Sequence, residues 1–138
     1  MPTLLNPYLE FKGNARQAME FYKSVFGGEL RMNTFKEYHA SQDPRDDDKI
    51  MHAQLETENN LTFMAADTID ETEYRAGSNF AMSLSGDDHS KLQNYYEKLS
   101  DGGMVFVPLE KAPWGDTFGM FTDKFGVKWM VNIAAQPA

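Results

Sequence analysis

The sequence predicts an α+β fold built from two consecutive βαβββ modules, and three observations predict it. Apolar and polar residues alternate over several short segments, as in strands, and apolar residues recur three and four positions apart in two longer segments, as in helices. The second half of the chain then repeats the order of the first half. Because a small sheet with one helix leaves one face uncovered, we expect a curved mixed sheet, a partial barrel with the helices outside and a cleft inside.

The length of the chain predicts a single domain. At 138 residues it can bury roughly two-thirds of its unfolded surface. We expect one domain over residues 1–138, with an internal repeat that divides it into a first module, residues 1–67, and a second module, residues 79–138. The acidic, aperiodic segment between the modules is interpreted as a linker.

Composition excludes several classes of partner. Thirteen Lys and Arg residues against twenty-one Asp and Glu give a net charge of −8, which disfavours phosphate backbones and anionic lipid, so we expect neither nucleic acid nor membrane as a partner. The chain has no cysteine, hence no disulfide and no thiolate metal site, which fits the cytosol. No signal-peptide pattern and no run near the ~20 apolar residues of a membrane span is found, so we predict a cytoplasmic protein.

The first predicted strand spans residues 4–11 and has one apolar and one polar face. Since Pro7 has no N–H to give to a ladder, it indicates an edge strand or a strand end. The apolar face carries Leu5, Leu9 and Phe11, and the polar face carries Asn6, Tyr8 and Glu10.

A helix and three more strands complete the first predicted module. Asn14 is the predicted N-cap of a helix over residues 15–26, which Gly27-Gly28 ends. The three strands are predicted at residues 30–38, 50–56 and 61–67, and the polar segment 41–49 between the first two is a loop. Alternation in the second of these strands places four residues on one face: Ile50, His52, Gln54 and Glu56.

The second module is predicted to follow the same order. A strand over residues 79–85 leads to a helix that starts after Asp87-Asp88 and stops at Gly102-Gly103. The final strands are predicted at 104–109, 117–122 and 128–133, with a turn at 123–126 between the last two. The two helices align at one constant spacing, which places Phe21-Tyr22 on Tyr95-Tyr96, Val25 on Leu99 and Gly28 on Gly102.

This doubled plan resembles the vicinal oxygen chelate superfamily of glyoxalases, extradiol dioxygenases and bleomycin-resistance proteins. The resemblance rests on Pro7-Tyr-Leu-Glu-Phe-Lys-Gly13 and Ala18-Met-Glu-Phe-Tyr-Lys-Ser-Val-Phe-Gly-Gly28. Three further segments are similar to its PhnB-like branch, often labelled 3-demethylubiquinone-9 3-methyltransferase: Lys49-Ile-Met-His-Ala53, Trp114 with Gly119 and Thr122-Asp-Lys-Phe-Gly-Val127, and Trp129-Met-Val-Asn132. The resemblance implies a glyoxalase-like fold.

The resemblance also implies a divalent metal, held by His, Gln or Glu from the first and last strands of each half. Motif alignment puts Asn6 and Asn79 at the two first-strand positions, and Met64 and Met130 at the two last-strand positions. Neutral amides are weak donors and thioethers suit soft copper, so we expect a vestigial metal site and no cofactor. A methyltransferase cofactor site is not expected, because the glycine pairs follow helices instead of opening them.

His52 is the first candidate for chemistry, because an imidazole can act as base, acid or ligand near neutral pH. The alternative is a structural histidine bonded to a backbone carbonyl. Glu10 as a base and Tyr8 as a donor are the other catalytic candidates, with plain solvation of Glu10 as the alternative. The predicted ligand-binding residues are Tyr8, Glu10, His52, Gln54, Met64, Trp114, Phe118 and Met130.

The function predicted from these residues is binding of a small organic ligand in an apolar cleft, without the inherited metal. Two alternatives stay open: a metal-dependent enzyme of the glyoxalase or dioxygenase type, with a site rebuilt from His52 and Glu10, and the methyltransferase-labelled activity of the family. A structural dimer with a vestigial cleft is a weaker third. In each case we expect a homodimer.

Overall fold

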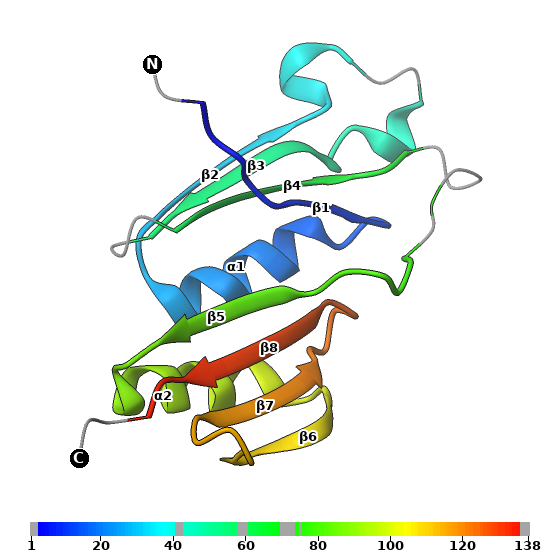
Figure 1. Ribbon diagram of the computed structural model, residues 1–138. Coiled ribbons are helices and arrows are strands. Elements are labelled where there is room, and N and C mark those ends of the chain that lie inside the picture. Colours follow the sequence, from blue (N-terminus) through cyan, green and yellow to red (C-terminus); the bar gives the residue numbers. More distant parts are fainter. Residues whose placement is uncertain (1–2, 41–42, 58–60, 70–73, 75, 136–138) are drawn as a thin grey trace. The chain divides into compact units, whose positions relative to one another are not determined.

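The computed structural model describes residues 3–40, 43–57, 61–69, 74 and 76–135. The chain divides into two compact units, Met1–Ala76 and Gly77–Ala138. Each unit contains a strand, a helix and three further strands, in that order, and its strands form one open four-stranded sheet (Figure 1). The prediction of an α+β fold with two βαβββ modules is therefore confirmed.

In the first unit, helix α1 covers one face of a sheet with the strand order β1-β4-β3-β2. Strand β1 runs parallel to β4, and the other neighbours are antiparallel. Tyr22 of α1 packs edge-on against Phe63 of β4, with ring centroids 5.5 Å apart. The main elements are β1 (Tyr8–Phe11), α1 (Ala15–Phe26), β2 (Glu29–Thr34), β3 (Ile50–Glu56) and β4 (Thr62–Asp67), with short 3-10 helices at Lys36–Tyr38 and Pro44–Asp46.

In the second unit, helix α2 packs on a sheet with the strand order β5-β8-β7-β6. Tyr96 of α2 packs against Phe121, with ring centroids 5.2 Å apart, and its ring also lies over Gly119. A Cβ at Gly119 would lie 2.7 Å from that ring, so only glycine allows this close approach. The elements are β5 (Met82–Gly86), α2 (His89–Ser100), β6 (Met104–Lys111), β7 (Thr117–Thr122) and β8 (Lys128–Ile133).

A buried carboxylate ties the first unit together. Asp67, at the end of β4, accepts hydrogen bonds from the backbone N–H groups of Gly13 (3.0 Å), Ala15 (2.9 Å) and Ile50 (2.9 Å). It thereby joins the last strand, the start of α1 and the start of β3. Asn14 occupies the N-cap position, as predicted, but its side chain makes no capping bond. Asp67 satisfies the helix start from a distant strand instead.

A second buried carboxylate shapes the hairpin of the second unit. Asp123 accepts from the backbone N–H groups of Phe125 (2.8 Å) and Val127 (3.1 Å) and from the indole N–H of Trp129 (2.9 Å). The predicted turn between β7 and β8 is confirmed, and its first residue also binds the largest buried side chain of that unit.

The two helices have the same length, and the aligned spacing of the repeat holds along both of them. The alignment of the two modules no longer holds just after the helices. Gly28 packs against the backbone of Glu56 and Thr57, while Gly103, not Gly102, packs in the same way against Thr122 and Asp123. The predicted match of Gly28 with Gly102 is therefore wrong by one residue, because the second unit has one more residue between its helix and the close approach.

The first strand of each unit starts later than predicted. Strand β1 begins at Tyr8, and Leu5, predicted to lie on an apolar face, is fully exposed (100%). Pro7 explains the late start, because it offers the neighbouring strand only its carbonyl, which accepts from the N–H of Met64 (3.0 Å). Strand β5 begins at Met82. Asn6 and Asn79 therefore lie outside the strands to which they were assigned.

A β-bulge corrects two further predictions in the first unit. Strand β2 ends at Thr34 and a 3-10 turn follows, so the predicted strand over residues 30–38 is too long. Asn33 is paired with His52 but Thr34 with Ile50, which leaves Met51 as the extra residue. The bulge reverses the alternation, so Ile50 is buried (1% exposed) and does not share the face of His52.

No helix in the part of the chain that the structure describes is long and apolar enough to cross a membrane. The predicted turn at residues 58–60 and part of the predicted linker, residues 70–73 and 75, lie outside the described residues.

Replacing Asp67 tests the tie between the elements of the first unit. We expect Asp67→Ala to lower the free energy of unfolding by about 3 kcal/mol or more, because three backbone N–H groups lose their acceptor at ~1–3 kcal/mol each. The control is Asp88→Ala, which removes one capping bond, to the N–H of Lys91, and should cost about 1 kcal/mol. Urea unfolding gives both values, and an equal loss in the two variants contradicts the proposed role of Asp67.

Candidate functional site

The candidate site lies on the face of the first sheet that points away from α1. In β4, Phe63 and Ala65 are buried, whereas the alternating Met64 is half-buried and points to the other face. Met64 is the register partner of Tyr8 on one side and of Gln54 on the other. Register partners project from the same face of a sheet. Tyr8, Met64 and Gln54 therefore form a row across three strands.

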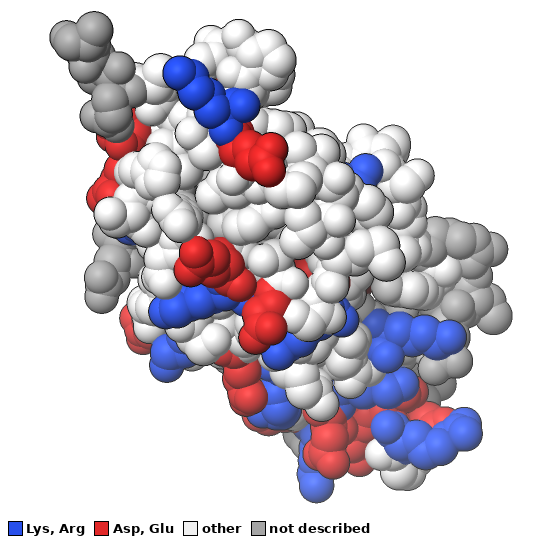
Figure 2. All heavy atoms as spheres, turned by 90° about the horizontal axis from the view of Figure 1, so that it is seen from below, with Lys and Arg blue, Asp and Glu red and all other residues white. Residues whose placement is uncertain are grey.

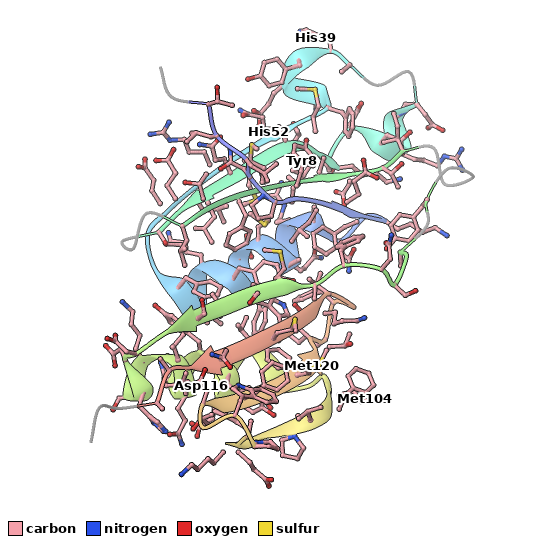
Figure 3. All side chains as sticks on the ribbon, viewed as in Figure 1. Tyr8, His39, His52, Met104, Asp116 and Met120 are labelled. Carbon is pink, nitrogen blue, oxygen red and sulfur yellow. The ribbon has the colours of Figure 1, made fainter. Side chains whose placement is uncertain are left out.

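Tyr8 and His52 lie close together on this face (Figure 3). The Tyr8 hydroxyl is 3.5 Å from Nδ1 of His52, and the ring centroids are 6.0 Å apart with the planes tilted by 38°. A separation of 3.5 Å is long for an O–H···N hydrogen bond, so the pair is adjacent without being tightly bonded. Both polar groups therefore keep most of their capacity to bond a third group.

The environment of Tyr8 keeps its phenol neutral. Partial burial raises the pKa of Tyr8, and the nearby Glu10 carboxylate raises it further. The hydroxyl is therefore a hydrogen-bond donor throughout the neutral pH range. Glu10 itself is exposed, two residues along β1, and is paired in register with Ala66. Gln54 is half-buried, and its amide donates to the Glu56 carboxylate at 2.7 Å.

The residues at the first-strand and last-strand positions do not fit a divalent metal. Asn6 and Asn79 lie outside the first strands, and the register pairs Met64 with Tyr8 and Met130 with Ser83. A phenol, a hydroxyl and two thioethers are poor ligands for Zn, Ni or Fe. Nor do the described residues include a group of three or more His, Cys, Asp or Glu placed to hold a metal ion.

The open face of the second sheet carries the remaining predicted ligand-binding residues. Met130 lies between Ser83 and Met120 in register, and Phe118 is paired with Asn132. The Trp114 ring lies 5.6 Å from the Phe118 ring at an interplanar angle of 65°. The structure therefore brings Trp114 and Phe118 together within one unit.

Asp116 is a residue of this face that sequence reasoning missed. Its carboxylate accepts from the Asn132 side-chain amide at 3.0 Å and from the backbone N–H of Ala135 at 2.9 Å. The bond from Asn132, followed by that from Ala135, lowers the pKa of Asp116. The available signal was the position of an Asp between a Trp-Gly turn and an aromatic strand, but the sequence does not show that Asn132 lies opposite.

The other two histidines lie elsewhere. His39 follows a 3-10 helix in a left-handed conformation (φ 51°), and it lies apart from Tyr8 and His52 (Figure 3). His89 is the first residue of α2. Charges also fail to form a single-sign surface in the view of Figure 2, where acidic and basic side chains are interspersed. This distribution gives no support to binding of a phosphate backbone.

Comparison with known proteins places the chain in a family. The family model for 3-demethylubiquinone-9 3-methyltransferase matches residues 4–132. Protein YjdN of Escherichia coli (strain K12) is 29% identical, and the match covers 96% of each chain. The crystal structure of PA1353 from Pseudomonas aeruginosa is 36% identical with a TM-score of 0.81, covering 98% of this chain and 100% of that one.

More distant structures identify the fold. A PhnB protein from Bacillus cereus is 24% identical, with a TM-score of 0.78 over 96% of this chain and 100% of its own. A glyoxalase/bleomycin resistance protein/dioxygenase domain from Frankia sp. EAN1pec is 12% identical, with a TM-score of 0.66 over 97% and 98% of the two chains. The predicted glyoxalase-like fold is confirmed, and the chain belongs to the 3-demethylubiquinone-9 3-methyltransferase family, whose PhnB-like members share this fold.

Proposed function

We propose that the protein binds a small organic ligand on the open face of the first sheet, without a metal ion. The observation that carries the proposal is the row of Tyr8, Met64 and Gln54 with His52 beside Tyr8. It combines a polarizable apolar side chain with a phenol, an amide and an imidazole on a sheet face that its own helix does not cover.

The chemistry of these groups suits an organic molecule with a few polar atoms. Met64 can adapt its shape to an irregular apolar surface. A few polar groups around such a surface fix the orientation of a ligand, as in most small-molecule sites. Since the Tyr8 to His52 separation is long, a ligand atom can replace that contact without breaking a strong bond. Glu10 adds a negative charge at the side of the row.

The second unit is proposed to contribute Trp114, Phe118 and Met130 to ligand binding. The predicted single cleft shared by both modules stays a prediction. Of the alternatives, a rebuilt metal site needs a third donor beside His52 and Glu10, and the described residues supply no group of three. The methyltransferase-labelled activity gains no support from the strand-to-helix turns, neither of which has the G-x-G-x-x-G pattern.

Analysis of the purified protein separates ligand binding from metal chemistry. We expect protein prepared without a histidine tag to contain far less than one equivalent of Zn, Ni, Fe or Mn. Native mass spectrometry should reveal a copurifying organic molecule that Tyr8→Phe with His52→Ala loses and the control His39→Ala retains. Stoichiometric metal would overturn the metal-free proposal, and equal retention in all variants would overturn the site.

The stability of a His52 variant tests whether the side chain is free to serve a ligand. Because His52 is half-buried and its one described polar contact is long, His52→Ala should lower the free energy of unfolding by less than about 1 kcal/mol. Leu55→Ala, at a buried position of the same strand, should cost about 2–5 kcal/mol. Urea midpoints provide the comparison. Similar losses in both variants would assign His52 a structural role.

We propose that the protein is a homodimer and that its location is the cytoplasm, the latter supported by the cysteine-free composition. Strand β6 is the edge of its sheet, and its consecutive apolar residues include Met104 (62% exposed) and Phe106 (57% exposed). A second copy can cover this strand with its own β6 around a two-fold axis. Exposed apolar edge strands otherwise invite uncontrolled association.

Light scattering at micromolar concentration tests the dimer. We expect twice the mass of one chain for the wild type and the mass of one chain for Phe106→Glu, which places a charge on the β6 surface. The control is Tyr38→Glu, at an exposed aromatic position of the first unit, which should leave the dimer intact. A wild-type monomer would count against the proposal, as would a dimer that Phe106→Glu does not weaken.

A further inference from the structure

We propose that the second unit binds a small organic monocation, of the quaternary ammonium class, against Trp114 and Phe118 beside Asp116. The proposal goes beyond the site on the first sheet and rests on the proposed function only in its use of Trp114 and Phe118. It needs none of Tyr8, His52, Met64 and Gln54, so either site can fail alone. It rests on the geometry of the turn between β6 and β7 and on the charge of that turn.

The two aromatic rings form a corner in which Trp114 is exposed and Phe118 is half-buried. Trp114 and Phe118 lie with their centroids 5.6 Å apart at 65°, so their planes meet steeply. Trp114 is 62% exposed, which is unusual for so large an apolar side chain and is typical of a binding surface. Cations bind over the faces of aromatic rings, best over indole, and two rings set at an angle can contact one cation together.

A closed turn holds Trp114 in this exposed position. The backbone N–H of Ala112 donates to the carbonyl of Asp116 at 2.7 Å, and that of Gly115 donates to the carbonyl of Ala112 at 2.9 Å. Gly115 has φ +102°, a conformation that residues with a Cβ rarely adopt. Hydrogen bonds of the main chain therefore hold the indole in place, and its position does not depend on burial of the indole ring. Such preorganisation reduces the entropy cost of binding a ligand.

A fixed negative charge lies next to the corner. Asn132, which holds the Asp116 carboxylate, is the register partner of Phe118. Both groups that bond the carboxylate, the Asn132 amide and the Ala135 N–H, are neutral, and among the described residues no Lys or Arg is paired with Asp116. The same two bonds lower its pKa, so the carboxylate is anionic at neutral pH. Its charge remains uncompensated.

These features favour a cation over an anion or a neutral molecule. The ring quadrupoles and the carboxylate both attract positive charge, and the net charge of −8 repels anions from the whole protein. A quaternary ammonium group spreads its charge over methyl groups and has no N–H to satisfy, so aromatic faces can replace its water. A free carboxylate beside the rings adds attraction without needing direct coordination.

Two tryptophan side chains allow a direct test by NMR. The indole N–H of Trp114 should shift saturably on addition of choline, whereas that of Trp129, which is 1% exposed and bonded to Asp123, should not move. The neutral isostere 3,3-dimethylbutan-1-ol has carbon in place of the charged nitrogen and should bind at least about tenfold more weakly, equivalent to ~1.4 kcal/mol. Equal shifts with both probes, or no saturable shift with choline, would overturn the proposal.

Variants of the second unit measure how much Phe118 and Asp116 each contribute to choline binding. Phe118→Leu and Asp116→Asn should each weaken choline binding several-fold, and an unchanged Trp129 signal will show that each variant is folded. Asp43→Asn, a carboxylate of the first unit, is the matched charge control and should bind choline as the wild type does. If Asp116→Asn does not fold, Phe118→Leu decides the question. Undiminished binding in the folded variants would overturn the assignment, while the first-sheet site is judged separately by its own Tyr8 and His52 variants.

Discussion

The first unit depends on one buried carboxylate. Asp67 receives three backbone N–H groups from segments far apart in the sequence, at the start of α1 and the start of β3. A charged side chain is stable in a buried place only when hydrogen bonds replace its water, and here the main chain supplies them. The same bonds fix where α1 starts relative to the sheet. Residues on the face of the first sheet that points away from α1 are therefore not needed to position the helix, and they can serve ligand binding.

Periodicity predicted the order of the elements well because each element buries a patterned face. Helix α1 and the hairpin of β7 and β8 were predicted with the bounds that the structure shows, since their apolar spacing is regular and their turn residues are specific. The predictions failed where hydrogen bonds or strand pairing between distant segments determine the local structure. The sequence near Asn14 does not reveal that Asp67 caps the helix, nor does the sequence near Met51 reveal a bulge that is set by pairing with Asn33 and Thr34.

The candidate site was predicted in part. Alternation placed Tyr8 and Glu10 on the polar face of the first strand and His52 and Gln54 together on one face of another, and the structure has Tyr8 next to His52. The register between strands could not be read from the sequence, because two parallel or antiparallel strands can slide by two residues without changing which face is apolar. That freedom explains why the sequence does not reveal that Tyr8 lies opposite Met64 and Ser83 opposite Met130.

The turn between β6 and β7 has a consequence for how such a protein can evolve. Its closing bonds join main-chain atoms of Ala112, Gly115 and Asp116, and none involves the side chain of Trp114. Residue 114 can therefore be exchanged without loss of the turn or of the buried core beneath it. A lineage could alter its preferred ligand by single substitutions at this position at little risk to folding, which would allow homologues with the same backbone to diverge in what they recognise.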